Sequence, residues 1–347
     1  MKIVFLLRNN IKNKIGGSEY QVYLLGKYLK KKYKHEVIHI FEDNDLHSGK
    51  YLLKNYGSNR YSFLNYHRLK NYLKEIKPDI IYQRVNNIYS FFSYYMSKSM
   101  KIRSIYHFGL DNDYSYRISN PGSILRYYSI KHSDTIIAQT KFQYNKLLGY
   151  KGIKEQFYNC LEISRERPFK KENIITWIGN IKPAKGLERL IPIAKSIKNS
   201  DIKILVIGRN DNSKYSKNIL KKIEGIENIS YIGYKQVDEV NSILKRTKFF
   251  INTSFLEGFP NTYLQSWNNG VPTISLNIDP DNIIMNNNIG FVSNDYNSLK
   301  EYIIQLMNDE NMYNELSNRT KEYVIRNHDI EKNIKKFHEI MLLTKKI

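Results

Sequence analysis

One loop of the sequence joins an acid to a glycine, a proline and the expected start of a helix. Glu257 follows an apolar run, and a helical pattern begins near Thr262. Backbone N–H groups at a helix start are unsatisfied and attract phosphate, while a carboxylate accepts hydrogen bonds from sugar hydroxyls. Gln265 stands three residues into this helix, so its side chain points back toward the loop. These groups predict one small polar binding site, whose backbone is Gly258, Phe259, Pro260, Asn261 and Thr262.

A capped helix is the alternative interpretation of this loop. Asn261 or Thr262 would then be the capping residue, and Gln265 would close a capping box. Capping does not account for Glu257, the Gly-Phe-Pro that follows it and the later Gly-Val-Pro, all in this order. We therefore favour the binding site.

Two more loops between an expected strand and an expected helix have residues suited to phosphate. The loop after the apolar run 174–178 contains Lys185, which we expect above the edge of the sheet as a point charge for a diphosphate. An early loop contains Gly16-Gly17, where the backbone can approach a ligand closely. The alternatives are an ordinary loop with exposed lysines and a turn in which Ser18 is the N-cap. On these residues alone both alternatives stay open.

The sequence offers little to a metal ion. Asp111 and Asp113 form an acidic pair just after His107, but two acids in such a loop are more often solvated. No histidines and cysteines have the spacing of zinc ligands. We predict that the protein needs no metal and no cofactor.

Composition limits the class of protein. The 347 residues are too many for one small core and predict about two domains, and 41% hydrophobic residues exclude a disordered chain. The single cysteine, Cys160, excludes a disulfide framework and fits a reducing compartment. No apolar run approaches the roughly 18 residues of a spanning helix. We expect a cytoplasmic protein.

The charge balance points to an anionic partner or to a lysine-rich composition, and both interpretations stay open. The formal net charge is +22, and residues 1–165 have 28 basic against 12 acidic side chains, a net +16. The aromatic stretch 88–96, followed by Lys98, is typical of a helix at a membrane interface, here the inner face of the plasma membrane, but also of a buried helix. No nucleic-acid recognition motif appears, so we predict no nucleic-acid partner.

Short β-rich runs alternate with helical patterns along the whole chain. This alternation predicts two doubly wound, Rossmann-like α/β domains facing across a cleft, at 1–165 and 170–329, with a linker over 165–171. We expect the final helix, about 330–347, to pack back on the first domain. The predicted strands are 2–7, 36–41, 79–83, 103–107, 135–138, 174–178, 203–208, 230–232, 249–253 and 273–275, and the main predicted helices are 18–32, 61–76, 187–196, 237–245 and 262–268.

The chain resembles glycosyltransferase family 4 enzymes of the GT-B fold. The resemblance rests on the glycine pair 16–17, the Lys185-Gly186 segment that opens the second domain, and Glu-Gly-Phe-Pro at 257–260 before Gly-Val-Pro at 270–272. It implies retaining transfer of a sugar from a UDP- or GDP-linked donor to a saccharide or lipid-linked saccharide. The stretch 261–267 with Asp-Pro-Asp at 279–281 also looks like members that assemble capsule, O-antigen or exopolysaccharide units.

The resemblance also implies roles for single residues. Glu257 matches the glutamate beside the donor sugar, and the segment 258–262 matches the backbone that holds the sugar and phosphates. Lys185 matches the lysine that neutralises the diphosphate, and the glycine pair 16–17 matches the loop that closes over it. His107 matches a histidine near the donor sugar and acceptor, with a core histidine as its alternative. Arg209 is placed near the donor.

Two positions depart from the family pattern. Gln265 replaces the second glutamate of the motif, which accepts hydrogen bonds from the ribose, and an amide oxygen accepts such bonds more weakly than a carboxylate. Asn180 replaces a diphosphate-binding arginine, whose charge Lys182 or Arg209 would have to supply. The alternative function is therefore a catalytically silent GT-B subunit that binds a nucleotide sugar or a partner enzyme.

Overall fold

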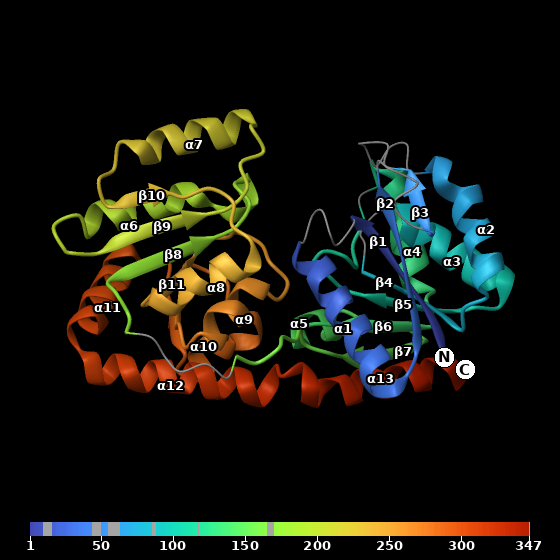
Figure 1. Cartoon of the computed structure of the whole chain (residues 1–347). Coiled ribbons are helices and arrows are strands. Elements are labelled where there is room, and N and C mark those ends of the chain that lie inside the picture. Colours follow the sequence, from blue (N-terminus) through green and yellow to red (C-terminus); the bar gives the residue numbers. More distant parts are fainter. Residues whose placement is uncertain are drawn as a thin grey trace. The chain divides into compact units, whose positions relative to one another are not determined.

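The computed structural model divides into two compact units (Figure 1). It describes residues 1–9, 16–43, 50–54, 63–84, 88–116, 118–164 and 170–346. Unit 1 comprises Met1–Leu161 and Ile330–Ile347, and unit 2 comprises Glu162–Asp329. Most of the predicted linker, 165–169, lies outside the described residues.

Unit 1 is built on a seven-stranded parallel sheet with the strand order β3-β2-β1-β4-β5-β6-β7. The order reverses at β1, which pairs with β2 on one side and β4 on the other, as in a doubly wound sheet. The strands are β1 (Lys2–Asn9), β2 (Glu36–Asp43), β3 (Leu52–Lys54), β4 (Ile80–Gln83), β5 (Arg103–His107), β6 (Thr135–Ala138) and β7 (Ile153–Gln156).

Helices cover this sheet, and one of them comes from the far end of the chain. Val22, Leu25 and Leu29 of α1 share a buried cluster with Phe337 and Met341 of α13, because both helices turn an apolar face to the sheet. The helices of unit 1 are α1 (Gly17–Tyr33), α2 (Tyr66–Ile76), α3 (Ile88–Met100), α4 (Pro121–Lys131), α5 (Lys141–Asn145) and α13 (Ile330–Lys346).

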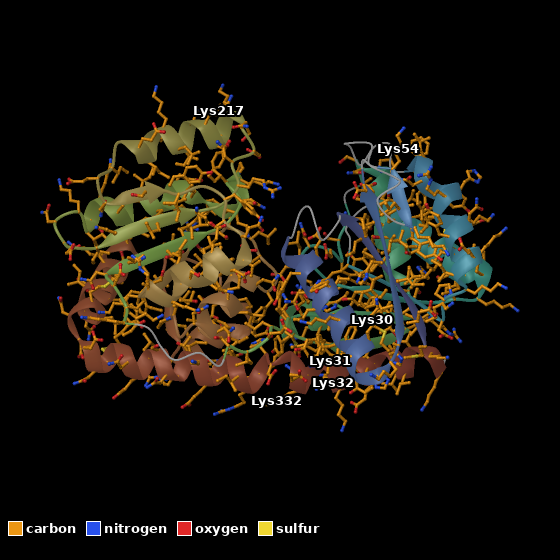
Figure 2. The ribbon with its side chains drawn as sticks, viewed as in Figure 1. Lys30, Lys31, Lys32, Lys54, Lys217 and Lys332 are labelled. Atoms are coloured by element: carbon orange, nitrogen blue, oxygen red, sulfur yellow. The ribbon has the colours of Figure 1, made fainter. Side chains whose placement is uncertain are left out.

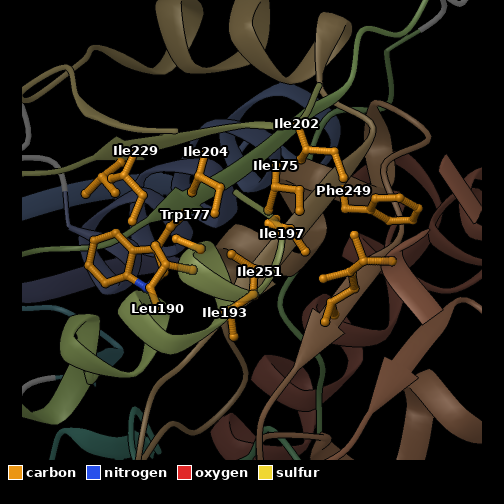
Figure 3. Packing of buried hydrophobic residues seen from close by; sticks show 14 of the residues in the cluster. Ile175, Trp177, Leu190, Ile193, Ile197, Ile202, Ile204, Ile229, Phe249 and Ile251 are labelled. Carbon is orange, nitrogen blue, oxygen red and sulfur yellow. The ribbon is translucent and has the colours of Figure 1, made fainter. Parts of the chain in front are cut away.

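Unit 2 repeats the architecture with six parallel strands in the order β10-β9-β8-β11-β12-β13. Its core lies between the sheet and α6, where Trp177 and Ile251 meet Leu190 and Ile193 (Figure 3). The strands are β8 (Ile174–Ile178), β9 (Lys203–Ile207), β10 (Ile229–Tyr231), β11 (Phe249–Asn252), β12 (Thr273–Ser275) and β13 (Gly290–Val292). Two parallel sheets with helices confirm the predicted α/β fold class.

The helical segments of unit 2 differ from prediction mainly at their starts. The helix expected at 187–196 begins as a 3₁₀ turn, η3, because Gly186 takes a left-handed φ of 57° just before it. The segments are η2 (Pro183–Lys185), η3 (Leu187–Arg189), α6 (Leu190–Ser196), α7 (Lys214–Glu224), α8 (Val237–Arg246), α9 (Asn261–Asn268), η4 (Pro280–Asn282), α10 (Ile283–Asn286), α11 (Tyr296–Asn308) and α12 (Glu310–Asn327).

The docking of α13 gives a stability prediction for unit 1. Phe337 is fully buried against Tyr82 and Phe157, so Phe337→Ala should lower the free energy of unfolding of unit 1 by about 3–5 kcal/mol. Both tryptophans of the chain, Trp177 and Trp267, lie in unit 2. In urea unfolding the far-UV circular dichroism should therefore shift, while the tryptophan fluorescence transition should stay in place.

Leu343→Ala, on the exposed side of the same helix, is the matched control and should change the unfolding free energy by less than about 0.5 kcal/mol. An equal shift of the tryptophan transition in Phe337→Ala would contradict separate stabilisation of unit 1 by α13.

Candidate active site

Two loops of unit 2 are held together at the carboxyl ends of the neighbouring strands β8 and β11. The N–H of Phe255 donates to the carbonyl of Ala184 at 3.0 Å, and the Thr253 hydroxyl donates to the carbonyl of Lys185 at 2.8 Å. The indole N–H of Trp177 donates to the Thr253 hydroxyl oxygen at 2.8 Å. These bonds fix the backbone from which Lys185 projects.

Lys185 and Glu257 are in direct contact. The Nζ of Lys185 pairs with Oε1 of Glu257, which also accepts a hydrogen bond from the Ser254 hydroxyl at 2.8 Å. The exposed fraction of the Glu257 side chain is 11% and that of Lys185 is 32%. A carboxylate this buried requires charged or hydrogen-bonded partners, because an unpaired buried charge is costly. The structure thus brings the two predicted charges together, and their catalytic roles stay a prediction.

Arg189 also contacts the loop that follows β11. Its guanidinium donates to the carbonyl of Thr253 at 3.0 Å and to the side-chain oxygen of Asn277, and it lies 4.8 Å from the centre of the Phe255 ring. Gly186 lies between the loops, where a Cβ atom would come within 2.5 Å of the Thr253 carbonyl oxygen. Only glycine permits this close approach and the positive φ.

The segment after Glu257 leads directly into α9. Its N-cap position is Pro260, which makes no side-chain cap, so the capping-box alternative with Asn261 or Thr262 is wrong. Gly258, Phe259 and Pro260 are buried, whereas Asn261, Thr262 and Gln265 are half-buried. Phe259 packs on Trp267 and His328, which holds the loop against unit 2.

Asn180 and Arg209 belong to adjacent loops, those that follow β8 and β9. The N–H of Ile181 donates to the carbonyl of Arg209 at 3.0 Å, and a Cβ atom on Gly208 would collide with the carbonyl of Gly179. The Asn180 side chain is exposed. The Arg209 guanidinium lies 4.9 Å from the centre of the Tyr234 ring, so aromatic contact holds this cation at the sheet edge.

His107 ends strand β5 in unit 1 and is fully buried. Its Nδ1 lies 2.7 Å from the Tyr82 hydroxyl oxygen. Burial, and then the nearby positive charge of Arg84, lower the pKa of His107 well below 6.5, so the ring is neutral at pH 7. This environment matches the alternative of a core histidine. Contact with a substrate stays a prediction.

The glycine pair begins α1, at the same edge of the sheet as His107. Gly16 is the N-cap and Gly17 the first helical residue, so the alternative with Ser18 as the cap is wrong. A Cβ atom on Gly109, two residues after His107, would lie 3.8 Å from the Ser18 hydroxyl oxygen. Within unit 1 the helix start and the end of β5 are therefore neighbours.

The sequence did not predict that two charged side chains of unit 1, Arg84 and Asp113, are buried. Arg84 is 5% exposed, and its guanidinium donates to the side-chain oxygen of Asn159 at 2.6 Å. Asp113, expected to be solvated, is buried and accepts the N–H groups of Gly109 and Leu110 at 2.6 and 3.0 Å. A charged residue directly after a predicted strand was the only signal for Arg84. Among the described residues no group of three or more His, Cys, Asp or Glu is arranged for a metal ion.

Comparison with known families accounts for both units. The model described as Glycosyltransferase Family 4 matches residues 15–162, and the model described as Glycosyl transferases group 1 matches residues 161–323. Together the two glycosyltransferase models match residues 15–323. The family 4 match covers most of unit 1, and the group 1 match covers nearly all of unit 2.

Two curated relatives are similar over part of the chain. An uncharacterized glycosyltransferase of Methanocaldococcus jannaschii is 28% identical over 209 residues, 56% of each chain. The capsular polysaccharide biosynthesis glycosyltransferase CapM of Staphylococcus aureus is 28% identical over 201 residues, 53% of this chain and 51% of CapM. The chain spans about half the length of these relatives in the matched regions.

Solved structures share the fold over nearly the whole chain. Sucrose-phosphate synthase of Thermosynechococcus elongatus has a TM-score of 0.78 at 12% identity, with 98% of each chain covered. HepE of Anabaena, in complex with UDP and glucose, has a TM-score of 0.77 at 13% identity, with 98% of this chain and 99% of HepE covered. At these identities the similarity shows the fold alone, and it confirms the predicted GT-B class.

The buried histidines of unit 1 predict how the free energy of unfolding of this unit depends on pH. Burial also lowers the pKa of His39 to about 4, while an unfolded histidine titrates near 6.5. Below pH 6.5 these histidines bind protons in the unfolded chain but stay neutral in the folded protein. The free energy of unfolding of unit 1 therefore falls as the pH is lowered. The loss approaches about 1.4 kcal/mol per pH unit for each histidine.

Urea unfolding followed by circular dichroism at pH 7, 6 and 5 measures this slope. His107→Gln keeps a polar side chain beside Tyr82 but does not titrate, so its slope should be smaller than that of the parent chain by about one histidine's share. Identical slopes in the two proteins would show that the pKa of His107 does not differ between the folded and unfolded states.

Proposed function

We propose that the protein transfers a sugar from a UDP- or GDP-linked donor, with retention of configuration, to a saccharide or lipid-linked saccharide of a cell-surface polysaccharide. The observation that carries this proposal is the contact between Lys185 and Glu257 at the carboxyl end of the unit 2 sheet. Ligands of open α/β sheets bind at that end of the strands. The similarity to CapM, named for capsular polysaccharide biosynthesis, supports the polysaccharide role.

Departure of a nucleoside diphosphate places negative charge on phosphate and positive charge on the anomeric carbon. In the proposed donor complex the diphosphate replaces Glu257 as the partner of the Lys185 ammonium, and the start of α9 lies near the phosphates. Glu257, released from the lysine, then faces the hydroxyls of the sugar and its developing positive charge.

Bond exchange proceeds on one face of the sugar. The bond from the anomeric carbon to the phosphate oxygen breaks with its electron pair leaving on the diphosphate, and the acceptor oxygen forms the new bond from the same side. The acceptor's proton passes to the departing phosphate. Glu257 keeps its hydrogen bond from Ser254 in this complex and acts as an electrostatic partner, which suits this route better than a covalent intermediate.

A thermal-shift panel of nucleotide sugars tests the proposal. One base and one sugar should raise the melting temperature most, because a ligand that binds only the folded state stabilises it by mass action. The preferred compound is then assayed for transfer and for slow hydrolysis. If no nucleotide sugar stabilises the protein at millimolar concentration, the proposal fails.

Glu257→Gln separates binding from transfer. The substitution removes the charge that occupies Lys185, so calorimetry should show UDP or GDP binding about tenfold tighter, equivalent to about 1.4 kcal/mol. Transfer should fall at least about 100-fold, because the anomeric carbon loses its carboxylate.

Ser254→Ala is the matched control, since it removes one hydrogen bond to the same carboxylate and keeps the charge. It should change both quantities by less than Glu257→Gln does. Weaker nucleotide binding in Glu257→Gln would show that the diphosphate does not compete with this ion pair.

A catalytically silent subunit is the second candidate, favoured by Gln265 and Asn180. If the parent chain binds a nucleotide sugar but neither transfers nor hydrolyses it, this function replaces the first. Gln265→Glu and Asn180→Arg should then each tighten donor binding about fivefold, because hydrogen bonds to charged groups exceed neutral ones by about 1 kcal/mol. Unchanged affinity in both variants would place these positions outside the donor contacts.

We also propose that transfer needs no metal or cofactor, so activity should persist in EDTA. Cytoplasmic location with peripheral contact at the inner face of the plasma membrane fits a lipid-linked acceptor, and we propose it without a nucleic-acid partner. No helix in the described part of the chain has the length and apolar character to cross a bilayer.

A further inference from the structure

Exposed apolar side chains concentrate in one stretch of unit 1. Among the described residues, 18 large hydrophobic side chains are exposed, and eight of them lie between residues 110 and 148. Single exposed residues need no explanation, whereas exposed apolar side chains that gather on one face mark a binding surface. The eight are Leu110, Tyr116, Ile118, Ile124, Leu125, Tyr128, Phe142 and Leu148, and they are called the 110–148 surface below.

Hydrogen bonds within the stretch hold its segments against one another. The segment after β5 reaches α5, because Lys146 donates to the carbonyl of Asp111 at 2.9 Å and Gln143 donates to its carboxylate at 2.9 Å. The same segment reaches α4, because Arg126 donates to the carbonyl of Ser115 at 2.8 Å. Residues from α4, the 110–116 segment and α5 therefore lie side by side.

Helix α4 presents the middle of the surface. Ile124, Leu125 and Tyr128 are exposed at a spacing that puts them on one side of the helix, while Ile130 packs in the core. The Tyr128 ring meets Tyr94 of α3 with 5.7 Å between ring centres. The Tyr128 ring is therefore held in place while it stays exposed.

The charge exposed on this stretch is positive. Its acidic side chains are bonded within the protein. Asp113 accepts hydrogen bonds from backbone N–H groups, and Asp111 accepts one from Gln143. Asp134 pairs with Lys98 at 3.0 Å, and its side chain is 8% exposed. Its three lysines, Lys131, Lys141 and Lys146, remain exposed, and Lys151, just beyond the stretch, is exposed as well. Apolar and tyrosine side chains beside lysines have the chemistry that an anionic lipid interface accepts.

We propose that the 110–148 surface docks on an anionic lipid bilayer. Two copies of the chain meeting through it would set lysine against lysine, whereas anionic headgroups neutralise those charges. This inference rests on the peripheral membrane contact proposed above and locates that contact on unit 1. It does not depend on sugar transfer.

The proposed surface differs from the stretch that the sequence singled out. In the aromatic stretch 88–96, Tyr89 and Phe92 of α3 are buried in the core, whereas Tyr95 is exposed. The residues of the proposed surface come instead from α4, α5 and the segment after β5.

Co-sedimentation of the full chain with vesicles tests the proposal. The protein should sediment with phosphatidylcholine vesicles that contain phosphatidylglycerol and remain in solution with phosphatidylcholine alone. Lys131→Gln with Lys151→Gln should weaken partitioning about 25-fold, since each lysine contributes about fivefold. Ile118→Ser with Leu148→Ser, both 84% exposed, should weaken it at least about tenfold without unfolding the protein.

Matched controls lie elsewhere on the chain. Leu342→Ser with Leu343→Ser alters exposed apolar residues of α13, and Lys217→Gln with Lys222→Gln alters exposed lysines of α7, where Figure 2 labels Lys217. Both should sediment like the parent chain. All variants should keep the parent's melting temperature and nucleotide affinity, so a failure of lipid binding is distinguishable from a failure of the proposed function.

Three outcomes overturn the proposal. The first is a parent chain that stays in solution with anionic vesicles at low salt, and the second is unaltered sedimentation of both surface variants. The third is a dimer by analytical ultracentrifugation that Ile118→Ser with Leu148→Ser converts to monomer, which would assign the surface to a second copy.

Discussion

The contact between the Lys185 ammonium and the Glu257 carboxylate depends on the pairing of β8 with β11. Because these strands are parallel neighbours, their carboxyl ends meet at one edge, and the loops that follow them meet as well. Thr253 then links the loops through its hydroxyl and its carbonyl, and Gly186 allows their close approach. The nearly buried carboxylate requires this arrangement, since without the lysine its charge would be unpaired.

The sheet topology and the shared location of Lys185 and Glu257 could be predicted from the sequence. The contacts of Arg189 and Thr253 that hold the two loops together could not. Alternating strand and helix patterns predict parallel sheets, and charged residues after strands predict a shared edge. Arg189 stood inside an expected helix, and its contact with Thr253 exists because a 3₁₀ turn replaces the start of that helix. A turn of this kind depends on the packing of the opposing loop, which local sequence does not encode.

The burial of His107 shows the same limit at longer range. The ring lies beside Tyr82 and Phe157, and both of these pack on Phe337 of α13. A strand-end histidine is expected at a ligand site, but here a helix more than 200 residues later in the sequence contributes to its apolar surroundings. The backbone of Ile330 donates to the carbonyl of Leu161, so the chain returns to unit 1 where it left it.

Burial of acids makes the surface of unit 1 more basic than its composition. Asp134 bonds to the backbone and hydroxyl of Ser104, and Asp113 bonds to two backbone N–H groups, so both carboxylates serve the fold. Lysines, whose ammonium groups are costly to bury, stay at the surface. The lysine-rich composition sets the number of positive charges. The burial of acidic side chains makes the electrostatic potential at the surface more positive than that number alone would. An anionic bilayer, the partner proposed for unit 1, is one that such a field attracts.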